Sequence, residues 1–285
     1  LPDPWRPLPS SSIFRRLMGI PDLIPKTTGA ASKNSYNSLF SGVPDLENAL
    51  SHNVSLGYYS FNMFNYTNVF AFLNYSKRID QIRNLNNFES VIVTRSPFNS
   101  SYADETATAS GRFQRRFGKL QASINGNFTY SKFNQVIQGT QSVNENYGQT
   151  YRLELRTNYR DAPNVEIGYR YTISDNDQGS TRTKFYTKAP SIEFDAYIWK
   201  AVTFKTDFSY NNFSDEDGTL YDYEFWNASL SYRKDKDAKF EYEIKATNLL
   251  DTKSQARSNT GAYSVSATEY FIQPRFLTFR LRYEL

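Results

Sequence analysis

The stretch Leu120–Ser131, LQASINGNFTYS, decides the fold class of this chain of 285 residues. Every second residue from Leu120 to Tyr130 is apolar, aromatic or glycine, and each residue between them is Gln, Ser, Asn or Thr. Successive side chains of a β-strand point to opposite faces, so the stretch predicts a strand with one apolar and one polar face. The same period of two returns in the segments 151–159, 165–173, 192–198, 202–210, 226–232, 240–246 and 277–285.

The connections between these segments fall into two classes that alternate along the chain. Short turns at 62–65, 118–119, 161–164, 199–201 and 234–238 alternate with longer polar connections at about 83–89, 134–147, 174–182, 211–222 and 251–263. Outer-membrane barrels have short periplasmic turns and longer external loops. A soluble β-sandwich has no reason to sort its loops in this way. Aromatic residues, 16% of the chain, also gather near strand ends, as in the two girdles of such barrels.

The fold class predicted from this pattern is all-β, as a transmembrane antiparallel β-barrel with about eleven strands. Residues 1–50 carry seven prolines and are predicted to be a mostly extracellular, irregular lead-in, with the barrel strands at 51–285. Single-chain bacterial barrels have an even number of strands, so eleven indicate part of a larger barrel. The predicted location is the outer membrane of a Gram-negative bacterium, with its lipids as partners.

Alternation also assigns the two faces of the predicted strands. Leu153, Leu155, Ile167 and Phe204 are predicted to face lipid. Arg152, Glu154, Arg156 and Arg160 are predicted to face the lumen, where they line a ligand path, hold a plug or simply fill space.

Composition argues against several classes of function. There is no Cys, which excludes disulfides and thiolate metal sites, and the single imidazole, His52, excludes a multi-histidine site. The net charge of +4 is dispersed, so nucleic acid is not expected as a partner. His52 stands at a strand start, and no enzymatic activity is expected. No cofactor is expected, although the acidic loops 175–179 and 215–218 offer the oxygen ligands that Ca²⁺ takes, with a solvated loop as the alternative.

Three passages of the chain resemble those of TonB-dependent outer-membrane receptors. Ser41–Leu46, SGVPDL, followed by Ser51–Tyr58, SHNVSLGY, is similar to the passage that leads from an external loop into a barrel strand. Asn248–Lys253, NLLDTK, is similar to a passage one strand before the end, and Arg275–Leu285 is similar to the closing strand. The resemblance covers about residues 40–285. It implies a 22-stranded barrel, of which these strands are the C-terminal half.

The same resemblance implies a function and a set of partners. The expected function is import of a large scarce nutrient, such as a ferric siderophore, a glycan or a peptide, with an N-terminal plug and TonB as partners. The closing strand, with Leu277, Phe279, Leu281, Tyr283 and Leu285, is expected to be read by the assembly machinery. One alternative is a non-transporting scaffold that binds lipoproteins or other subunits of an outer-membrane complex. Another is a small closed barrel that acts as a pore.

Overall fold

The structure, a computed structural model, is all-β over the residues that it describes. These are residues 11–18, 31–35, 38–43, 45–89, 92–137, 140–160, 163–179, 181–199, 201–235, 237–260 and 265–284. The closing residue Leu285 lies outside them.

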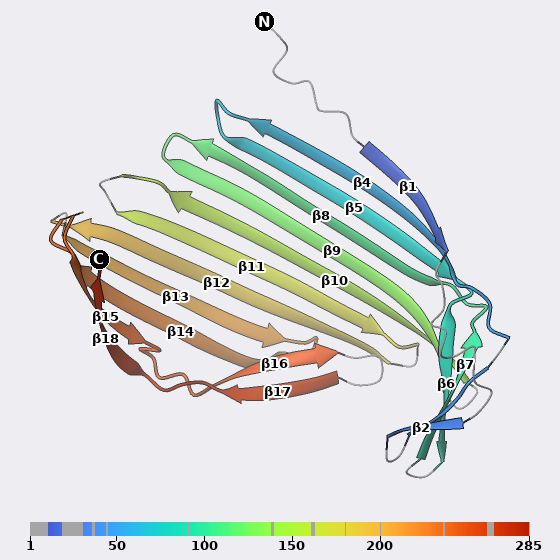
Figure 1. The fold of residues 1–285 in the computed structure, drawn as a ribbon. Coiled ribbons are helices and arrows are strands. Elements are labelled where there is room, and N and C mark those ends of the chain that lie inside the picture. Colours follow the sequence, from blue (N-terminus) through green and yellow to red (C-terminus); the bar gives the residue numbers. More distant parts are fainter. Residues whose placement is uncertain are drawn as a thin grey trace, which may run out of the picture.

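One large antiparallel sheet dominates the molecule and curves into an open trough (Figure 1). Eleven of its strands are the predicted ones, so the all-β class and the strand number are confirmed. A twelfth strand, β1 (Ser11–Met18), lies within the predicted lead-in and pairs with the first of the eleven. In spatial order the eleven are β4 (Leu50–Asn62), β5 (Thr67–Ile79), β8 (Asp104–Phe117), β9 (Leu120–Ile137), β10 (Thr140–Thr157), β11 (Asn164–Asp177), β12 (Arg182–Ile198), β13 (Val202–Ser214), β14 (Thr219–Tyr232), β15 (Phe240–Thr247) and β18 (Phe276–Tyr283).

The sheet is not closed over the described residues. Its two outermost strands, β1 and β18, pair with β4 and β15 respectively but not with each other. The short turns lie at one end of the strands and the longer connections at the other (Figure 1).

Several connections predicted to be polar loops are strands instead. β6 (Ile82–Glu89) and β7 (Ile92–Asn99) form a hairpin between β5 and β8, and β7 also pairs with β3 (Ser38–Ser41), which pairs with β2 (Ala31–Ser35). β16 (Ser254–Thr260) and β17 (Val265–Phe271) form a separate two-stranded sheet. Backbone pairing continues beyond the apolar pattern because unpaired N–H and C=O groups are costly whatever the side chains are.

The cross-strand register sorts side chains onto two faces. Leu155 lies opposite both Ala122 and Ile167, and Ile167 lies opposite Ile192, so the apolar positions of neighbouring strands coincide. Leu153 and Phe204 share this face through the same register, which continues across β12, β13 and β14. We call it the convex face and its opposite the concave face.

The convex face is apolar and uncovered. Leu153, Leu155 and Ile167 are 47%, 48% and 53% exposed, whereas the buried hydrophobic residues among those described are only Leu46, Ala189 and Ala196. The part of the chain that the structure describes therefore has no conventional hydrophobic core. Its large apolar side chains are exposed on the convex face instead.

Small residues hollow one part of the convex face. Ala71, Gly111 and Gly126 lie opposite one another on β5, β8 and β9, between the larger Tyr58 and Tyr151. A shallow groove of ≈ 590 Å³ forms there.

Candidate functional site

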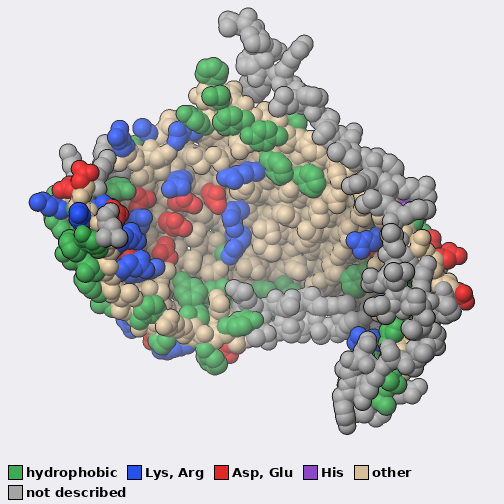
Figure 2. Space-filling view, in the orientation of Figure 1, with side chains coloured by type: hydrophobic (Ala, Val, Ile, Leu, Met, Phe, Trp, Pro, Cys, Tyr) green, Lys and Arg blue, Asp and Glu red, His purple; other side chains and the backbone are tan. Residues whose placement is uncertain are grey.

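The concave face carries a row of arginines across four neighbouring strands. Arg112 of β8 and Arg152 of β10 both lie opposite Asn125 of β9, and Arg152 lies opposite Arg170 of β11. All three arginines are exposed. Figure 2 looks onto the concave face and shows charged side chains gathered in its hollow.

Aromatic side chains extend this row at its β4–β5 end. Tyr59 lies opposite Phe70, and Phe70 lies opposite Arg112. Tyr59 is 51% exposed and Phe70 is 42% exposed on the concave face, where Phe61 and Phe72 of the same two strands are exposed as well. Hydrophobic side chains lie along the upper rim over β4 and β5 in Figure 2. We call the six residues Tyr59, Phe70, Arg112, Asn125, Arg152 and Arg170 the arginine–aromatic row.

A cavity of ≈ 330 Å³ lies over the middle of the arginine–aromatic row. Its polar groups have few partners within the protein: Arg112 Nη2 donates to the neutral Gln114 Oε1 at 2.7 Å, and Arg152 Nη1 lies 3.8 Å from Glu154 Oε1. The residues with side chains around the cavity are Phe70, Ser110, Arg112, Asn125, Asn127, Thr150 and Arg152.

The predicted lumen residues separate into two groups. Arg152, Glu154 and Arg156 all stand on the concave face, where Ser123 Oγ donates to Glu154 Oε2 at 3.0 Å. Arg160 lies beyond the end of β10 in the exposed turn, so it does not continue the row as the spacing predicted. Strand β10 ends at Thr157, three residues before Arg160. Whether these groups line a lumen stays a prediction.

Acidic side chains occupy the next part of the concave face. Glu166, Glu193 and Asp207 lie opposite one another on β11, β12 and β13. Glu166 Oε2 is 3.6 Å from Arg156 Nε, and Asp207 accepts a hydrogen bond from Asn227 Nδ2 at 2.7 Å. The concave face is therefore basic over β8 to β11 and acidic over β11 to β13. Alternation in the sequence predicted which side chains share the polar face. Only the register of the strands shows that the basic and acidic side chains lie in separate parts of it.

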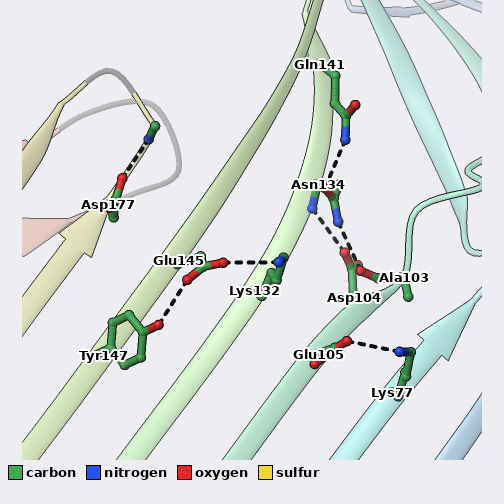
Figure 3. Close-up of polar contacts among 11 residues, drawn as sticks. Lys77, Ala103, Asp104, Glu105, Lys132, Asn134, Gln141, Glu145, Tyr147 and Asp177 are labelled. Atoms are coloured by element: carbon green, nitrogen blue, oxygen red, sulfur yellow. Dashed lines mark hydrogen bonds and ion pairs between the residues drawn. The ribbon is translucent and has the colours of Figure 1, made fainter.

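A polar junction fastens the β6–β7 hairpin to the main sheet, and Figure 3 shows its contacts around Asn134. The nearly buried Asn134 donates through its backbone N–H to Asp104 Oδ1 at 3.1 Å and through Nδ2 to the Ala103 carbonyl at 3.0 Å. Arg83 of the hairpin forms an ion pair with Asp104. Gln141 of β10 donates to Asn134 Oδ1 at 3.2 Å, so the junction joins four strands.

The NLLDTK passage forms a hydrogen-bonded corner at the end of β15. Asn248, which is 2% exposed and has φ 54°, donates through Nδ2 to the carbonyls of Thr252 and Gln273. Its Oδ1 accepts from the Thr252 N–H, and its own N–H donates to Asn227 Oδ1. The passage thereby ties β14, β15 and the approach to β18 together.

The acidic segments 175–179 and 215–218, which the sequence offered as calcium ligands, hold their carboxylates in local contacts. Arg182 donates to both oxygens of Asp175 at 2.9 and 2.7 Å. Asp215 Oδ1 accepts the backbone N–H groups of Asp217 and Gly218. Within the described ranges no three His, Asp or Glu side chains gather in a way that would hold a metal ion. Calcium binding stays a prediction.

The closing strand exposes its apolar side chains. Leu277, Phe279, Leu281 and Tyr283 are between 48% and 71% exposed, and β18 pairs only with β15 among the described strands. No helix in the described part of the chain is long and apolar enough to span a membrane. No protein-family model, curated protein or solved structure matches the chain.

Proposed function

We propose that the chain is part of an outer-membrane β-barrel of the TonB-dependent receptor type, which imports a large nutrient. One observation carries the proposal. The curved sheet exposes its apolar face outwards and its charged face inwards, which is the polarity of a barrel wall between lipid and a watery lumen. The transport function rests on the resemblance of the three passages described above.

The height of the apolar band supports insertion in a membrane. On the convex face, Lys77 forms an ion pair with Glu105 at 3.1 Å, and Lys132 forms one with Glu145 at 3.2 Å, as Figure 3 shows. From Thr67 to this charged level, a rise of about 3.3 Å per residue gives about 33 Å of strand. A tilt of about 40° reduces that to about 25 Å, the height of the apolar band in outer-membrane barrels.

Aromatic side chains lie at both edges of this band. Tyr130 and Tyr147 have ring centroids 4.9 Å apart. Each is the next residue on the convex face after the ion pair of Lys132 and Glu145, on the side of the apolar band. At the short turns, Phe64 and Trp199 are 96% and 88% exposed. Amphipathic aromatic rings are enriched at membrane–water interfaces, so the two sets fit two girdles.

The open edges of the sheet favour a larger barrel. In hydrocarbon, each unpaired backbone N–H or C=O costs several kcal/mol, and only a closed barrel pairs them all. Both β1 and β18 have one edge unpaired by any described strand. Further strands that pair with these edges would enclose a lumen wide enough for a large nutrient and for a plug.

A scaffold in a larger outer-membrane complex is the second candidate. The observation that favours it is the amount of structure beyond the apolar band, where β2, β3, β6 and β7 pair with one another. The β16–β17 hairpin adds a second such element. Paired strands offer a firmer surface to a partner protein than solvated loops do.

Uptake measurements separate the two candidates. The gene for the full-length protein and the gene for TonB are deleted separately, and growth is compared on a panel of scarce nutrients. The transport proposal expects both deletions to abolish uptake of the same nutrient. Unchanged uptake without the protein, combined with loss of a copurifying outer-membrane complex, would instead assign it the scaffold role.

A further inference from the structure

We infer that the arginine–aromatic row is a binding site for an elongated anionic ligand that carries acidic groups at one end and a ring at the other. The inference deepens the proposed function and rests on it in one respect: the concave face must line a lumen. It is argued from the charges, the register and the cavity of the row.

The charge of the row is not balanced by its neighbours. Elsewhere on the concave face arginines pair with acids on the adjacent strand, as Arg280 does with Glu243 at 3.0 Å and Arg282 with Glu241 at 3.0 Å. Arg152, in contrast, lies opposite Arg170 and Asn125. Like charges directly opposite each other destabilise a sheet, and a bound anion would relieve that repulsion.

The acids close to the row do not neutralise it. Glu154, on the same strand as Arg152, is 3.8 Å from it and also accepts the Ser123 hydroxyl. Arg112 bonds only to a neutral amide, and Arg170 forms no ion pair with any residue that the structure describes. Of the three exposed guanidinium groups, only that of Arg152 lies near a described carboxylate, so the row favours an anion. Guanidinium forks match carboxylate or phosphate groups.

The register sets the length of the ligand. Neighbouring strands lie about 4.8 Å apart, so the backbones of Arg112 and Arg152 are about 10 Å apart and Arg170 about 5 Å further. A single small ion does not span that distance, whereas a ligand with two or three acidic groups does. The cavity of ≈ 330 Å³ over Asn125 is at the lower end of the range for small-molecule sites.

The aromatic end of the row adds ring recognition. Phe70 borders the same cavity as Arg112 and is 42% exposed, so its ring is available for stacking. Asn127 and Thr150 supply uncharged hydrogen-bonding groups on the same wall. An apolar wall with a few convergent polar groups is the usual lining of a small-molecule site. The ligand class is therefore a polycarboxylate or polyphosphate that also bears an aromatic or sugar ring.

Two probes test the charge and ring requirements separately. ATP carries a chain of phosphates at one end and rings at the other, and tripolyphosphate carries the phosphates without a ring. Binding of each to the full-length protein, purified in detergent, is measured by calorimetry. We expect the first to bind more tightly, and both to weaken as the ionic strength rises.

Variants of the row and one matched control complete the test. Arg112→Gln and Arg152→Gln should each weaken both probes by about tenfold, which corresponds to about 1.4 kcal/mol. Phe70→Ala should weaken ATP, the ring-bearing probe, and leave tripolyphosphate unchanged. Arg280→Gln, on the same face but ion-paired with Glu243, should change neither.

The outcomes also separate this inference from the proposed function. No binding of either probe, or equal loss in Arg280→Gln and Arg112→Gln, overturns the inference whatever the uptake result is. If neither probe binds and the row is covered by another part of the full-length protein, the row is a protein contact. Arginine-dependent binding without TonB-dependent uptake keeps the site and removes the transport function.

Discussion

At the residue scale, the NLLDTK corner shows why particular side chains occupy particular positions. Asn248 and Asp251 both have positive φ, 54° and 56°, a conformation that Asn and Asp tolerate better than most residues do. Both side chains also accept backbone N–H groups: Asn248 from Thr252, and Asp251 from Arg275. The sequence showed this passage as a resemblance only, because its partners Asn227, Gln273 and Arg275 are more than twenty residues away in the chain.

Replacing Asn248 is expected to destabilise the protein strongly. Asn248→Ala removes three side-chain hydrogen bonds at a buried site and adds strain at positive φ, so the loss should be on the order of 3 kcal/mol. Asn248→Gly removes the same hydrogen bonds but adds no strain at positive φ. Its stability should therefore lie between those of the wild type and Asn248→Ala. Unfolding of the protein in detergent by urea gives the values. Wild-type stability in Asn248→Ala would contradict the role of the corner.

Asp251 is expected to make the corner sensitive to acid. The contact with Lys253, followed by the hydrogen bond from the Arg275 N–H, lowers the pKa of the Asp251 carboxyl below its ordinary value. A lowered folded-state pKa stabilises the protein above the unfolded pKa of about 3.9, and this contribution is lost as the pH falls through the folded value.

The measurement compares the wild type with Asp251→Asn, which keeps an oxygen acceptor and tolerates positive φ. Thermal midpoints from pH 6 to pH 3 should fall further for the wild type than for the variant. Parallel curves for the two proteins would show that Asp251 contributes nothing to the acid sensitivity.

At the scale of elements, alternation predicted the strands of the large curved sheet well and the strands within the longer connections poorly. The turn at 118–119 was recognisable because a short connection needs a residue such as Gly118, which has φ 61°. The polar stretch 134–147 lacks an apolar face, so it was predicted to be a loop. The structure pairs it as a hairpin, with Gln141 opposite Val136. Backbone hydrogen bonding, which leaves no period in the sequence, forms the strands of these connections.

The two faces of β10 are expected to tolerate substitutions differently. Leu155 is 48% exposed among the apolar side chains of the convex face, so Leu155→Arg should cost about 2–4 kcal/mol at mid-membrane. Arg156→Leu, one residue further, faces the concave side and should cost much less. Folding of the full-length protein into lipid vesicles measures both. Equal tolerance of the two substitutions would show that the faces are wrongly assigned.

At the scale of the whole molecule, the strand number and the two faces followed from the sequence, whereas the division of charge over the concave face did not. Arg112, Arg152 and Arg170 are widely spaced in the chain and meet only through the register of β8 to β11. Register depends on turn geometry and on the bulk of neighbouring side chains. A single sequence does not reveal either of these across four strands.

The orientation of the molecule in the membrane is expected to place the long connections outside the cell. Cysteines introduced at Gln178 and Asp217 lie in the connections at one end of the sheet, and a cysteine at Asp235 lies in a short turn at the other end. The chain has no cysteine of its own, so labelling is specific. An impermeant maleimide applied to intact cells should label the first two positions and spare the third. The reverse pattern would invert the topology.

The unpaired edges lead to the last prediction, which concerns closure. β18 is paired with β15 through eight residues, Phe276 to Tyr283, and its other edge has no described partner, as is true of β1 beyond β4. In hydrocarbon such edges leave N–H and C=O groups unsatisfied, so a sheet of these strands alone should not insert stably. Residues 1–285 refolded alone in detergent are therefore expected to lack the heat-dependent shift in gel mobility and the protease resistance of closed barrels. The full-length protein, as the control, should show both. Deletion of residues 275–285 from it should abolish insertion, because β15 then becomes an open edge. A heat-modifiable, protease-resistant barrel formed by the 285 residues alone would mean that β1 and β18 pair with each other, and it would favour a small pore over a large receptor.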